Sequence, residues 1–370
     1  MRILHTEASL AWGGQEIRIL TEAAGMRRRG HDVRLACPRN ARIYVEARRY
    51  EVPVIALPIG RKGPHGVVEL RRLLAWHRVD VVNTHSSTDS WLAALSLRLF
   101  WLGRKRPPAL VRTRHISAPA PNRRSTRWLY TRATAEIVTT GEAIREQLIR
   151  DLGVSPARVT SIPTGIDPQR FAPGDKGFAR RTLGLPHGVP LVGIAATLRS
   201  WKGHRYLIEA MTLLAHRDAQ LVIVGDGPQR EALAAQIAEL KLSDRVRLVG
   251  NQADVAPWLR ALDVFALPSY ANEGVPQALM QAMLVGVPCV TTDAGAIGEI
   301  AIHDTTAIVV AKQNAVALAA GIDRLLSDTV LAARLAWSAG ERVRTKFGLD
   351  AMLDGMERVF RRAADGNRYR

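Results

Sequence analysis

Cysteine is scarce in this chain of 370 residues, which contains only Cys37 and Cys289, one in each half. Two thiols so far apart form no disulfide framework, and they lack the paired Cys-x-x-Cys spacing of a thiolate metal site. Long apolar runs are missing too: the longest apolar helix candidate, residues 91–102, is interrupted by Arg98 and falls far short of the ~20 residues that a spanning helix needs. Residues 1–6 already read as a strand, so no signal peptide is expected. We therefore expect a cytoplasmic protein that does not cross a membrane.

Acidic residues are few relative to basic ones, and the deficit is concentrated in the first half. The formal net charge is +18. Residues 1–170 carry 29 Lys and Arg against 14 Asp and Glu, whereas residues 171–370 carry 23 against 20. This asymmetry favours an anionic partner for the first half, such as the cytoplasmic face of a membrane. General solubility is the alternative interpretation, but it does not explain the asymmetry.

Several motifs of nucleotide and metal chemistry are absent. There is no Gly-x-x-x-x-Gly-Lys-Ser/Thr loop, which excludes a P-loop nucleotidase, and no His-Glu-x-x-His or Asp-x-Asp of a metal site. Gly225-Asp226-Gly227 follows a strand, but Arg230 stands where a dinucleotide fingerprint has its third glycine. We therefore expect no metal and no cofactor. Any bound diphosphate would be neutralised by Arg, Lys and backbone amides instead.

Short β-branched runs alternate with amphipathic stretches, which predicts strand–helix units and parallel sheets. The predicted strands are 1–6, 32–36, 53–57, 80–84, 110–114 and 136–139 in the first half, and 191–196, 221–224, 246–249, 264–267 and 289–292 in the second. Proline and glycine punctuation between Ser161 and Gly174 marks a domain boundary. The sequence thus predicts an α/β protein of two doubly wound, Rossmann-like domains, residues 1–165 and 166–346, with helical residues from 330 to about 362. Two such domains facing each other would place their strand ends on a common cleft.

The loop Trp12-Gly13-Gly14-Gln15-Glu16 connects the first strand to a helix. Two glycines let the backbone approach a phosphate closely, and the helix N-terminus behind them offers unpaired N–H groups. A tight strand-to-helix turn without a ligand accounts for the same glycines. Gly13 and Gly14 are therefore candidate substrate-binding residues, with the turn as the alternative.

Arg199 and Lys202 stand just after the first strand of the second half, in Leu198-Arg199-Ser200-Trp201-Lys202-Gly203. Two cations three residues apart at a strand end can both reach one diphosphate, Arg as a planar fork and Lys as a mobile point charge. Such a pair can stabilise the negative charge that develops on a leaving group. A solvated basic turn would contain the same residues.

Glu273 lies in the segment Pro268-Ser269-Tyr270-Ala271-Asn272-Glu273-Gly274-Val275-Pro276, directly before a predicted helix. Pro276 is a favoured residue in a first helical turn. Gln281 follows about two turns later, so both side chains can lean toward one ligand. A glutamate near a helix N-terminus can equally serve as a cap.

Two first-half segments combine basic with aromatic or apolar residues. Trp91, Leu95 and Leu99 recur at helical spacing, which predicts that they face the core. Residues 121–132 contain four arginines beside Trp128 and Tyr130. Because Lys and Arg near an anionic membrane each contribute ~1 kcal/mol of binding, we expect this second segment to contact an anionic lipid or a phosphorylated, lipid-linked acceptor.

Taken together, these segments resemble the retaining glycosyltransferases of family 4, which have the GT-B fold. The resemblance covers nearly the whole chain, and its most specific part continues from Glu273 to Gly298-Glu299-Ile300. The family has two glutamates separated by seven residues there, whereas this chain has Glu273 and Gln281. The resemblance implies an acceptor-binding and a nucleotide-sugar-binding domain around a central cleft. It also implies a C-terminal helix, residues 347–370, that packs back on the first domain.

The resemblance assigns roles in the second domain residue by residue. Glu273 would contact the hydroxyls of the donor sugar, and the amides of Gly274 and Val275 would hold the distal phosphate. Arg199 and Lys202 would neutralise the diphosphate as it leaves. Position 281 would bind the ribose hydroxyls of the nucleotide, where glutamine keeps a carbonyl acceptor but loses the charge.

His115, in Arg112-Thr113-Arg114-His115, matches the family's histidine at the end of a first-domain strand, beside the reacting sugar. Without the resemblance, a lone histidine at a strand end would more often be an ordinary hydrogen-bonded residue. His85 stands at a similar strand end and would line the acceptor side. His115, Arg199, Lys202 and Glu273 are thus the candidate catalytic residues.

The implied activity is retaining, metal-independent transfer of a sugar, of the hexosyltransferase type, from a nucleotide sugar. The family's usage favours UDP. The basic first half favours a glycan or lipid-linked acceptor of cell-envelope polysaccharide or lipopolysaccharide synthesis. Two other classes stay open: a non-catalytic sugar-nucleotide-binding protein, which Gln281 favours, and a basic nucleic-acid-binding protein. No pattern of a nucleic-acid-binding module is present, so no nucleic acid partner is expected.

Overall fold

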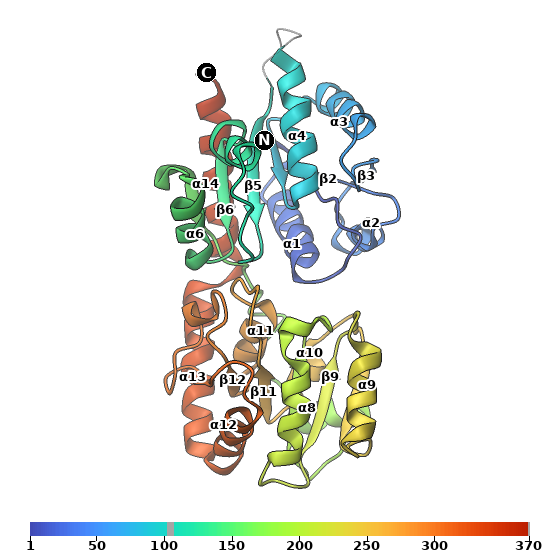
Figure 1. Cartoon of the computed structure of the whole chain (residues 1–370), viewed down its shortest axis with the longest axis vertical. Coiled ribbons are helices and arrows are strands. Elements are labelled where there is room, and N and C mark those ends of the chain that lie inside the picture. The colour runs from blue at the N-terminus through green and yellow to red at the C-terminus, as the bar shows by residue number, and fades with distance from the viewer. Residues whose placement is uncertain (102–106, 369–370) are drawn as a thin grey trace. The chain divides into compact units, whose positions relative to one another are not determined.

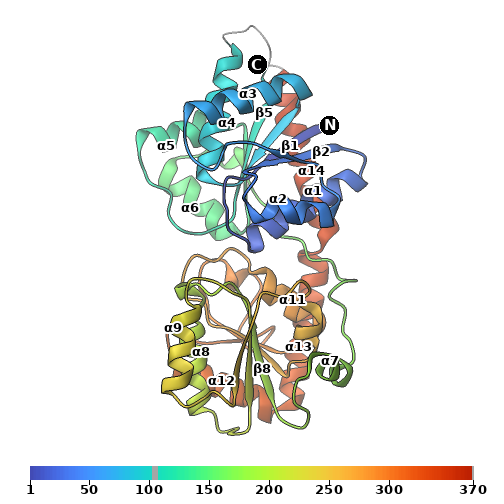
Figure 2. The same cartoon turned by 90° about the vertical axis from the view of Figure 1, so that its right-hand side faces the viewer.

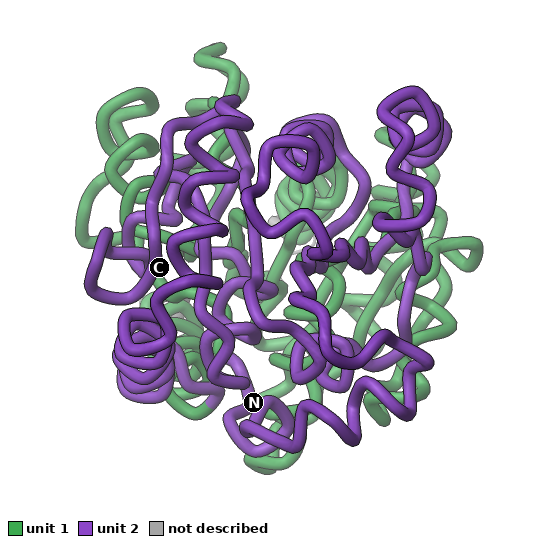
Figure 3. The backbone as a smooth tube through the Cα atoms, turned by 90° about the horizontal axis from the view of Figure 1, so that it is seen from below, with its two compact units in different colours: residues 1–165, 350–370 green, residues 166–349 purple. Residues whose placement is uncertain are grey.

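The structure is a computed structural model that describes residues 1–101 and 107–368. The chain forms two compact units (Figure 3). Unit 1 comprises Met1–Gly165 together with Asp350–Arg370, and unit 2 comprises Ile166–Leu349. Each unit is built around its own parallel sheet, with helices on both faces (Figures 1 and 2).

The sheet of unit 1 has seven parallel strands in the order β3-β2-β1-β4-β5-β6-β7. Its strands are β1 (Arg2–Thr6), β2 (Asp32–Cys37), β3 (Val54–Ala56), β4 (Val81–Thr84), β5 (Ala109–Arg114), β6 (Glu136–Thr139) and β7 (Val159–Ser161). The chain winds one way from β1 to β3 and the other way from β4 onward. The junction of β1 and β4 is therefore the switch point of a doubly wound sheet.

The helices of unit 1 cover both faces of this sheet. They are α1 (Gly14–Arg28), α2 (Arg42–Glu46), α3 (Pro64–His77), α4 (Ser87–Trp101), α5 (Arg124–Trp128), α6 (Glu142–Leu152) and α14 (Leu349–Arg368). The last of these, α14, packs on α1: a Cβ atom at Gly25 would lie 2.6 Å from the side chain of Leu353. An ion pair of 2.6 Å joins Arg29, the residue that follows α1, to Asp354 of α14. The last residues of the chain thus complete the first unit.

The sheet of unit 2 has six parallel strands in the order β10-β9-β8-β11-β12-β13. Its strands are β8 (Leu191–Ala195), β9 (Gln220–Val224), β10 (Val246–Gly250), β11 (Val264–Leu267), β12 (Cys289–Thr291) and β13 (Ile308–Val309). Its helices are α7 (Lys176–Leu183), α8 (His204–Leu213), α9 (Arg230–Glu239), α10 (Ala256–Arg260), α11 (Gln277–Val285), α12 (Ala315–Ser327) and α13 (Thr329–Lys346). The switch point lies between β8 and β11. Both sheets thus have the same winding.

Local sequence explains where these elements begin and why they are buried. Asp175, Asn314 and Asp328 cap α7, α12 and α13 by accepting hydrogen bonds from first-turn amides. The central strands β8 and β11 are buried along their whole length, as parallel strands covered by helices on both faces must be. Within the described residues, no helix is both long and apolar enough to span a bilayer.

Every predicted strand is present, whereas the strands β7 and β13, the helices α2, α5, α7 and α10, and a helix end at Lys346 are not among the predicted elements. β7 lies at the sheet edge and ends at Ser161, where the segment that the sequence marks as a boundary begins, and β13 has only two residues. The predicted helical stretch after residue 330 is interrupted, because α13 ends at Lys346 and α14 begins at Leu349. There Ile166 N donates to Phe347 O at 2.9 Å, and Leu349 N donates to Ile166 O at 3.1 Å. The hydrogen bonds that would continue the helix are replaced by this bridge.

The prediction that Trp91, Leu95 and Leu99 all face the core is wrong. Leu95 is 43% exposed, and Trp91 and Leu99 are half-buried. Their neighbours Leu92 and Leu97 supply the buried face of α4 instead. The helix is apolar over more of its circumference than a single core-facing stripe requires.

Candidate functional site

The predicted site residues of unit 2 lie at the strand ends beside its switch point. The loop after β8 carries Arg199 and Lys202, and the loop after β11 carries Glu273. These two strands are hydrogen-bonded neighbours from which the chain winds in opposite directions. In doubly wound sheets, ligands bind at the carboxyl ends of such strands. The topology therefore brings the three side chains to the expected binding position.

Lys202 and Glu273 contact each other directly. The distance between Lys202 Nζ and Glu273 Oε1 is 2.6 Å, and Glu273 is only 4% exposed. A charge held away from water needs a partner, so each side chain fixes the position of the other. The ammonium has three donors and the carboxylate two acceptor oxygens. Both therefore keep hydrogen-bonding capacity for a ligand.

The backbone holds the two loops together at two close approaches. A Cβ atom at Gly203, whose φ is +77°, would lie 2.0 Å from Pro268 O, and one at Gly295, whose φ is +59°, would lie 2.2 Å from Glu273 O. Both positions require glycine, for space and for conformation. Tyr270 N also donates to Trp201 O at 2.9 Å. The spacing of Lys202 and Glu273 is thus set by packed backbone.

Arg199 has a different partner. Its Cζ lies 5.5 Å from the centre of the Trp201 ring, and it forms no ion pair with any residue that the structure describes. A guanidinium stacked on an aromatic ring keeps its N–H groups free for an anion. Arg199 is therefore a cation available to a ligand beside the Lys202–Glu273 pair.

The segment after Glu273 offers backbone donors. α11 begins at Gln277 with Pro276 as its N-cap residue and without a side-chain cap, so the structure does not support a capping role for Glu273. The amides of Gly274 and Val275 donate no hydrogen bond to other described groups. Gln281 lies half-buried on the second turn of α11.

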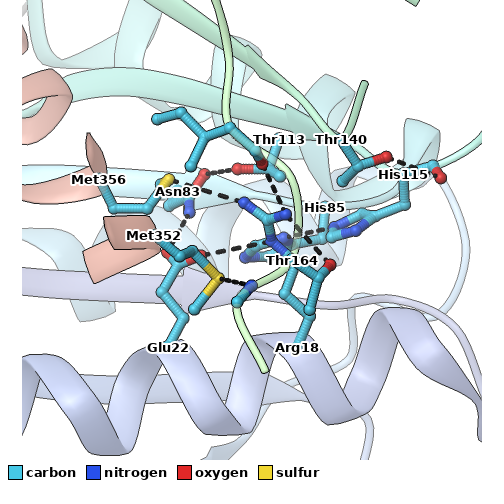
Figure 4. Close-up of polar contacts among 12 residues, drawn as sticks. Arg18, Glu22, Asn83, His85, Thr113, His115, Thr140, Thr164, Met352 and Met356 are labelled. Atoms are coloured by element: carbon cyan, nitrogen blue, oxygen red, sulfur yellow. Dashed lines mark hydrogen bonds and ion pairs between the residues drawn. The ribbon is translucent and has the colours of Figure 1, made fainter. Parts of the chain in front are cut away.

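In unit 1, His115 and His85, which are labelled in Figure 4, form a chain of three imidazoles with His5. His85 Nδ1 lies 2.9 Å from His115 Nε2, and His85 Nε2 lies 3.0 Å from His5 Nδ1. His5 lies on β1, His85 directly follows β4 and His115 directly follows β5. The row of imidazoles therefore crosses the switch point of this sheet, between β1 and β4. Both ring nitrogens of His85 are occupied by other histidines. The prediction that His85 itself contacts a substrate is therefore not supported, whereas His115 Nδ1 has no partner among the described residues.

A buried ion pair stands behind the histidine chain. Glu22 Oε1 lies 3.9 Å from His5 Nε2, and Glu22 Oε2 lies 3.6 Å from Arg18 Nε. Asn83 donates to Glu22 at 3.2 Å, and Arg18 donates to Ile162 O at 2.8 Å. Figure 4 shows Arg18 and Glu22 reaching from α1 toward these groups. The sequence analysis did not identify either residue, because the i, i+4 spacing of Arg18 and Glu22 is also that of an ordinary exposed salt bridge.

His5 and His85 are buried and His115 is half-buried, and loss of water contact disfavours the charged form of all three imidazoles. Burial lowers the pKa of His5 to about 3, with the Arg18 charge as a second cause. Burial also lowers the pKa values of His85 and His115 well below the usual range, again with positive neighbours adding to the effect. Glu22 responds in the opposite direction: burial raises its pKa to about 7, although Arg18 favours its ionised form. Glu22 is thus the group of this network that titrates near neutral pH.

A row of neutral imidazoles has only two hydrogen-bonded arrangements. Each ring has one N–H and one acceptor nitrogen, so two successive bonds require all protons on Nε2 or all on Nδ1. With every proton on Nε2, His5 directs its N–H toward Glu22 and His115 Nδ1 is an acceptor. With every proton on Nδ1, His115 Nδ1 is a donor. The state of Glu22 is therefore linked to the chemistry of the free nitrogen of His115.

The glycine loop before α1 lies near several acidic side chains. Glu7 is buried, and its carboxyl group accepts hydrogen bonds from Ser9 N at 2.7 Å and from the Gln15 side chain. Burial, followed by the nearby Asp89 and Glu16 carboxylates, raises the pKa of Glu7 to about 8. A phosphate at Gly13 or Gly14 would meet these acids, so the surroundings suit a hydroxyl-bearing ligand better. The turn interpretation of the two glycines also remains compatible with this geometry.

The described residues contain no group of three or more His, Cys, Asp or Glu side chains that could hold a metal ion. The structure instead brings the predicted residues together in two sets. Lys202 and Glu273 form a contact in unit 2 with Arg199 beside them, and His85 and His115 form part of the imidazole chain in unit 1.

Comparison with known proteins identifies the family. A model of glycosyltransferase family 4 matches residues 12–170, and one of glycosyl transferases group 1 matches residues 189–328. The chain is 30% identical over 315 residues to the D-inositol 3-phosphate glycosyltransferase of Xylanimonas cellulosilytica, covering 77% of this chain and 73% of that protein. It is 27% identical over 313 residues to the Escherichia coli UDP-Gal:alpha-D-GlcNAc-diphosphoundecaprenol alpha-1,3-galactosyltransferase, covering 79% of each.

The fold also matches solved structures. The Anabaena protein Alr3699/HepE in complex with UDP superimposes with a TM-score of 0.83 at 21% identity, covering 97% of this chain and 99% of that one. This likeness and the two doubly wound sheets confirm the predicted GT-B fold class. The chain is therefore an enzyme of the family 4 glycosyltransferases, of the group 1 type.

Proposed function

We propose that this enzyme transfers a hexosyl group from a UDP-sugar, with retention and without a metal ion, to a glycan or lipid-linked acceptor of cell-envelope polysaccharide or lipopolysaccharide synthesis. The observation that carries the proposal is the 2.6 Å contact between Lys202 and Glu273 at the unit 2 switch point. The UDP complex of the Anabaena protein supports the nucleotide. The diphosphoundecaprenol named for the E. coli relative supports the acceptor class.

The donor binds to unit 2 in this proposal. Glu273 accepts hydrogen bonds from the sugar hydroxyls, while Lys202 and Arg199 offset the charge of the diphosphate. The amides of Gly274 and Val275 donate to the distal phosphate, which explains why they are not used elsewhere in the fold. No divalent cation is required, because two cationic side chains and two amides already meet the anion.

The transfer proceeds on one face of the donor sugar. The bond from the anomeric carbon to the phosphate oxygen breaks, and a bond from the same carbon to the acceptor oxygen forms on the same face. The departing phosphate oxygen takes the acceptor's proton, so no protein nucleophile is needed. Gln281 accepts a hydrogen bond from the ribose through its amide oxygen, and His115 presents Nδ1 to a sugar hydroxyl. His85 acts by positioning His115.

The acceptor is assigned to unit 1. Its basic residues favour an acceptor that carries phosphate, and the arginines of residues 121–132 favour an anionic membrane surface on the cytoplasmic side. Arg123, Arg124 and Arg127 are exposed, so they are available for such a contact. The enzyme would then act as a peripheral protein.

Alanine substitution of Lys202 tests the catalytic role. Lys202→Ala should lower turnover at least ~100-fold, equivalent to about 2.7 kcal/mol of transition-state stabilisation. Lys346→Ala, which removes an exposed lysine at the end of α13, is the matched control and should leave turnover unchanged. Near-normal turnover of Lys202→Ala at saturating donor would remove Lys202 from this role.

A non-catalytic sugar-nucleotide-binding protein is the second candidate, because Gln281 replaces a charged residue of the family. Thermal-shift measurements with UDP-, GDP- and ADP-sugars identify the ligand, since a ligand at 100 times its Kd stabilises the folded state by about 2.7 kcal/mol. Donor binding without hydrolysis or transfer, tested over several acceptors, would favour the second candidate over the first.

A further inference from the structure

An apolar hollow lies on unit 1 along helices α3 and α4, which run side by side (Figures 1 and 2). Its volume is about 1090 Å³. Its wall is mostly aliphatic or aromatic and includes Val68, Trp91, Leu95 and Leu99, and its charged members are Lys62 and Arg98. The size is that of a site for a sizeable organic ligand.

The wall includes apolar side chains that a folded chain normally buries. Leu95 is 43% exposed and Val68 is 41% exposed, and they belong to neighbouring helices. Single exposed apolar residues are ordinary, whereas several that line one hollow indicate a ligand or partner. The sequence predicts a core position for Leu95, and the structure leaves it uncovered.

Two cations are held at this hollow by a pair of tryptophans. Trp91 and Trp128 stack with their ring centres 5.7 Å apart. Lys62 Nζ lies 5.6 Å from the centre of the Trp91 ring, and Arg98 Cζ lies 5.7 Å from that of Trp128. Neither cation forms an ion pair with a residue that the structure describes. The sequence has no Asp or Glu between positions 90 and 135, so no nearby carboxylate along this stretch offsets their charge.

We propose that the hollow takes an acyl chain of an anionic phospholipid in the bilayer, with Lys62 and Arg98 facing the lipid phosphate. The inference extends the membrane contact of the proposed function by naming where a lipid enters. Apolar depth, a cationic rim and tryptophans at the boundary match the three zones of a lipid: its chain, its phosphate and the interface between them. A free phosphate or nucleotide would leave the apolar wall unfilled, and an apolar peptide would leave the two cations without a counter-charge.

Co-sedimentation with vesicles tests the charged part. Vesicles of phosphatidylglycerol and phosphatidylcholine in equal amounts should bind the protein at low salt, and phosphatidylcholine alone should bind it weakly. The double variant Lys62→Gln/Arg98→Gln should weaken binding about 30-fold, from about 1 kcal/mol per cation near an anionic surface. Arg181→Gln/Lys346→Gln removes the same charge from exposed positions of unit 2 and should have little effect. Equal losses in both double variants, or equal binding to both vesicles, would overturn the assignment.

Fluorescence quenching tests the entry of the chain. Cys37 and Cys289 are both buried, so a fluorophore can be attached selectively at Leu95→Cys or, as a control, at Val316→Cys, which is 69% exposed on α12. Phosphatidylglycerol brominated along its acyl chains should quench the label at position 95 and leave the label at 316 bright. An unquenched label at 95, or quenching only by a prenyl-chain lipid, would refute the acyl assignment. A Leu95→Glu variant that changes the sedimentation coefficient but not vesicle binding would point to a second copy of the chain and refute it as well.

Donor binding in the same variants separates this inference from the proposed function. All hollow variants should keep the native thermal shift with UDP-sugar, because Lys62, Leu95 and Arg98 belong to unit 1, whereas Arg199, Lys202 and Glu273 belong to unit 2. Normal donor binding with no lipid effect overturns the hollow alone. Absence of donor binding in the native protein overturns the proposed function instead.

Discussion

Replacing Glu22 by glutamine tests whether a buried carboxylate sets the proton arrangement of the histidine chain. An ionised Glu22, with Oε1 3.9 Å from His5 Nε2, favours a proton on that nitrogen. The hydrogen bonds of 3.0 and 2.9 Å then require the same tautomer in His85 and His115. His115 Nδ1 is left as an acceptor. Glutamine keeps the shape of Glu22 and removes the charge.

The size of this bias follows from the distances. Two unit charges 3.9 Å apart interact by about 4 kcal/mol at an effective dielectric constant of 20. An N–H group carries only part of a charge, and Arg18 Nε, 3.6 Å from the carboxylate, opposes the effect. The net free-energy preference for the tautomer with protons on Nε2 is then about 1 kcal/mol, which corresponds to about a fivefold ratio of the two tautomers. Because burial raises the pKa of Glu22 to about 7, the acceptor form of His115 should increase between pH 6 and pH 8 in the native protein only.

Nitrogen NMR of protein labelled at histidine reads the tautomers directly. The Nδ1 signal of His115 should move toward the unprotonated position as the pH rises from 6 to 8, and Glu22→Gln should abolish this change. Glu136→Gln is the control, because Glu136 pairs with Arg362 at 3.1 Å and forms no hydrogen bond or ion pair with a histidine in the described part of the chain. An identical His115 signal in native and Glu22→Gln protein at pH 8 would refute the reasoning.

Three further predictions concern stability, the donor site and the thiols. Glu7→Gln should stabilise the protein by several kcal/mol at pH 8 and hardly at pH 4, because burial raises the pKa of Glu7 to about 8. The free-energy cost of keeping Glu7 protonated in the folded state grows as the pH rises above its unfolded pKa of about 4.5. Urea unfolding that gives the same difference between the two proteins at both pH values would contradict this. Gly295→Ala should weaken UDP-sugar binding by calorimetry, because its Cβ would lie 2.2 Å from Glu273 O, and unchanged affinity would argue against a fixed loop. Burial raises the pKa of the Cys37 thiol to about 12, so disulfide reagents should modify it only at the rate of unfolding; immediate reaction of native protein would disprove its inertness.

The strand pattern was predictable because parallel strands covered on both faces are continuous apolar runs. β8 and β11 are such runs, and the loops that follow them carry the cations and the glutamate that the resemblance assigns to the donor. The direct contact between Lys202 and Glu273 was not predictable from such a pattern. It depends on glycines at positions 203 and 295, whose role is to let one loop touch the backbone of another. A sequence shows the glycine but not its partner.

The histidine chain escaped prediction for a different reason. His5 lies in the middle of an ordinary strand, and Arg18 and Glu22 have the spacing of a surface pair. They are buried because α14, more than 300 residues later, covers α1: the Arg18 guanidinium lies 3.8 Å from Met356 Sδ. The periodicity of residues within one helix does not predict contacts with a segment so distant in the sequence.

The assignment of residues 350–370 to unit 1 has a consequence for synthesis on the ribosome. The first 165 residues emerge early, yet the helix that covers Arg18 and Glu22 emerges only after all of unit 2 has been made. During that interval the nascent first unit exposes a charged pair and the apolar surface around Gly25 to which Leu353 later binds. Unit 2, contiguous in the chain, is the part that can finish folding first, so the order of translation and the order of completion are reversed.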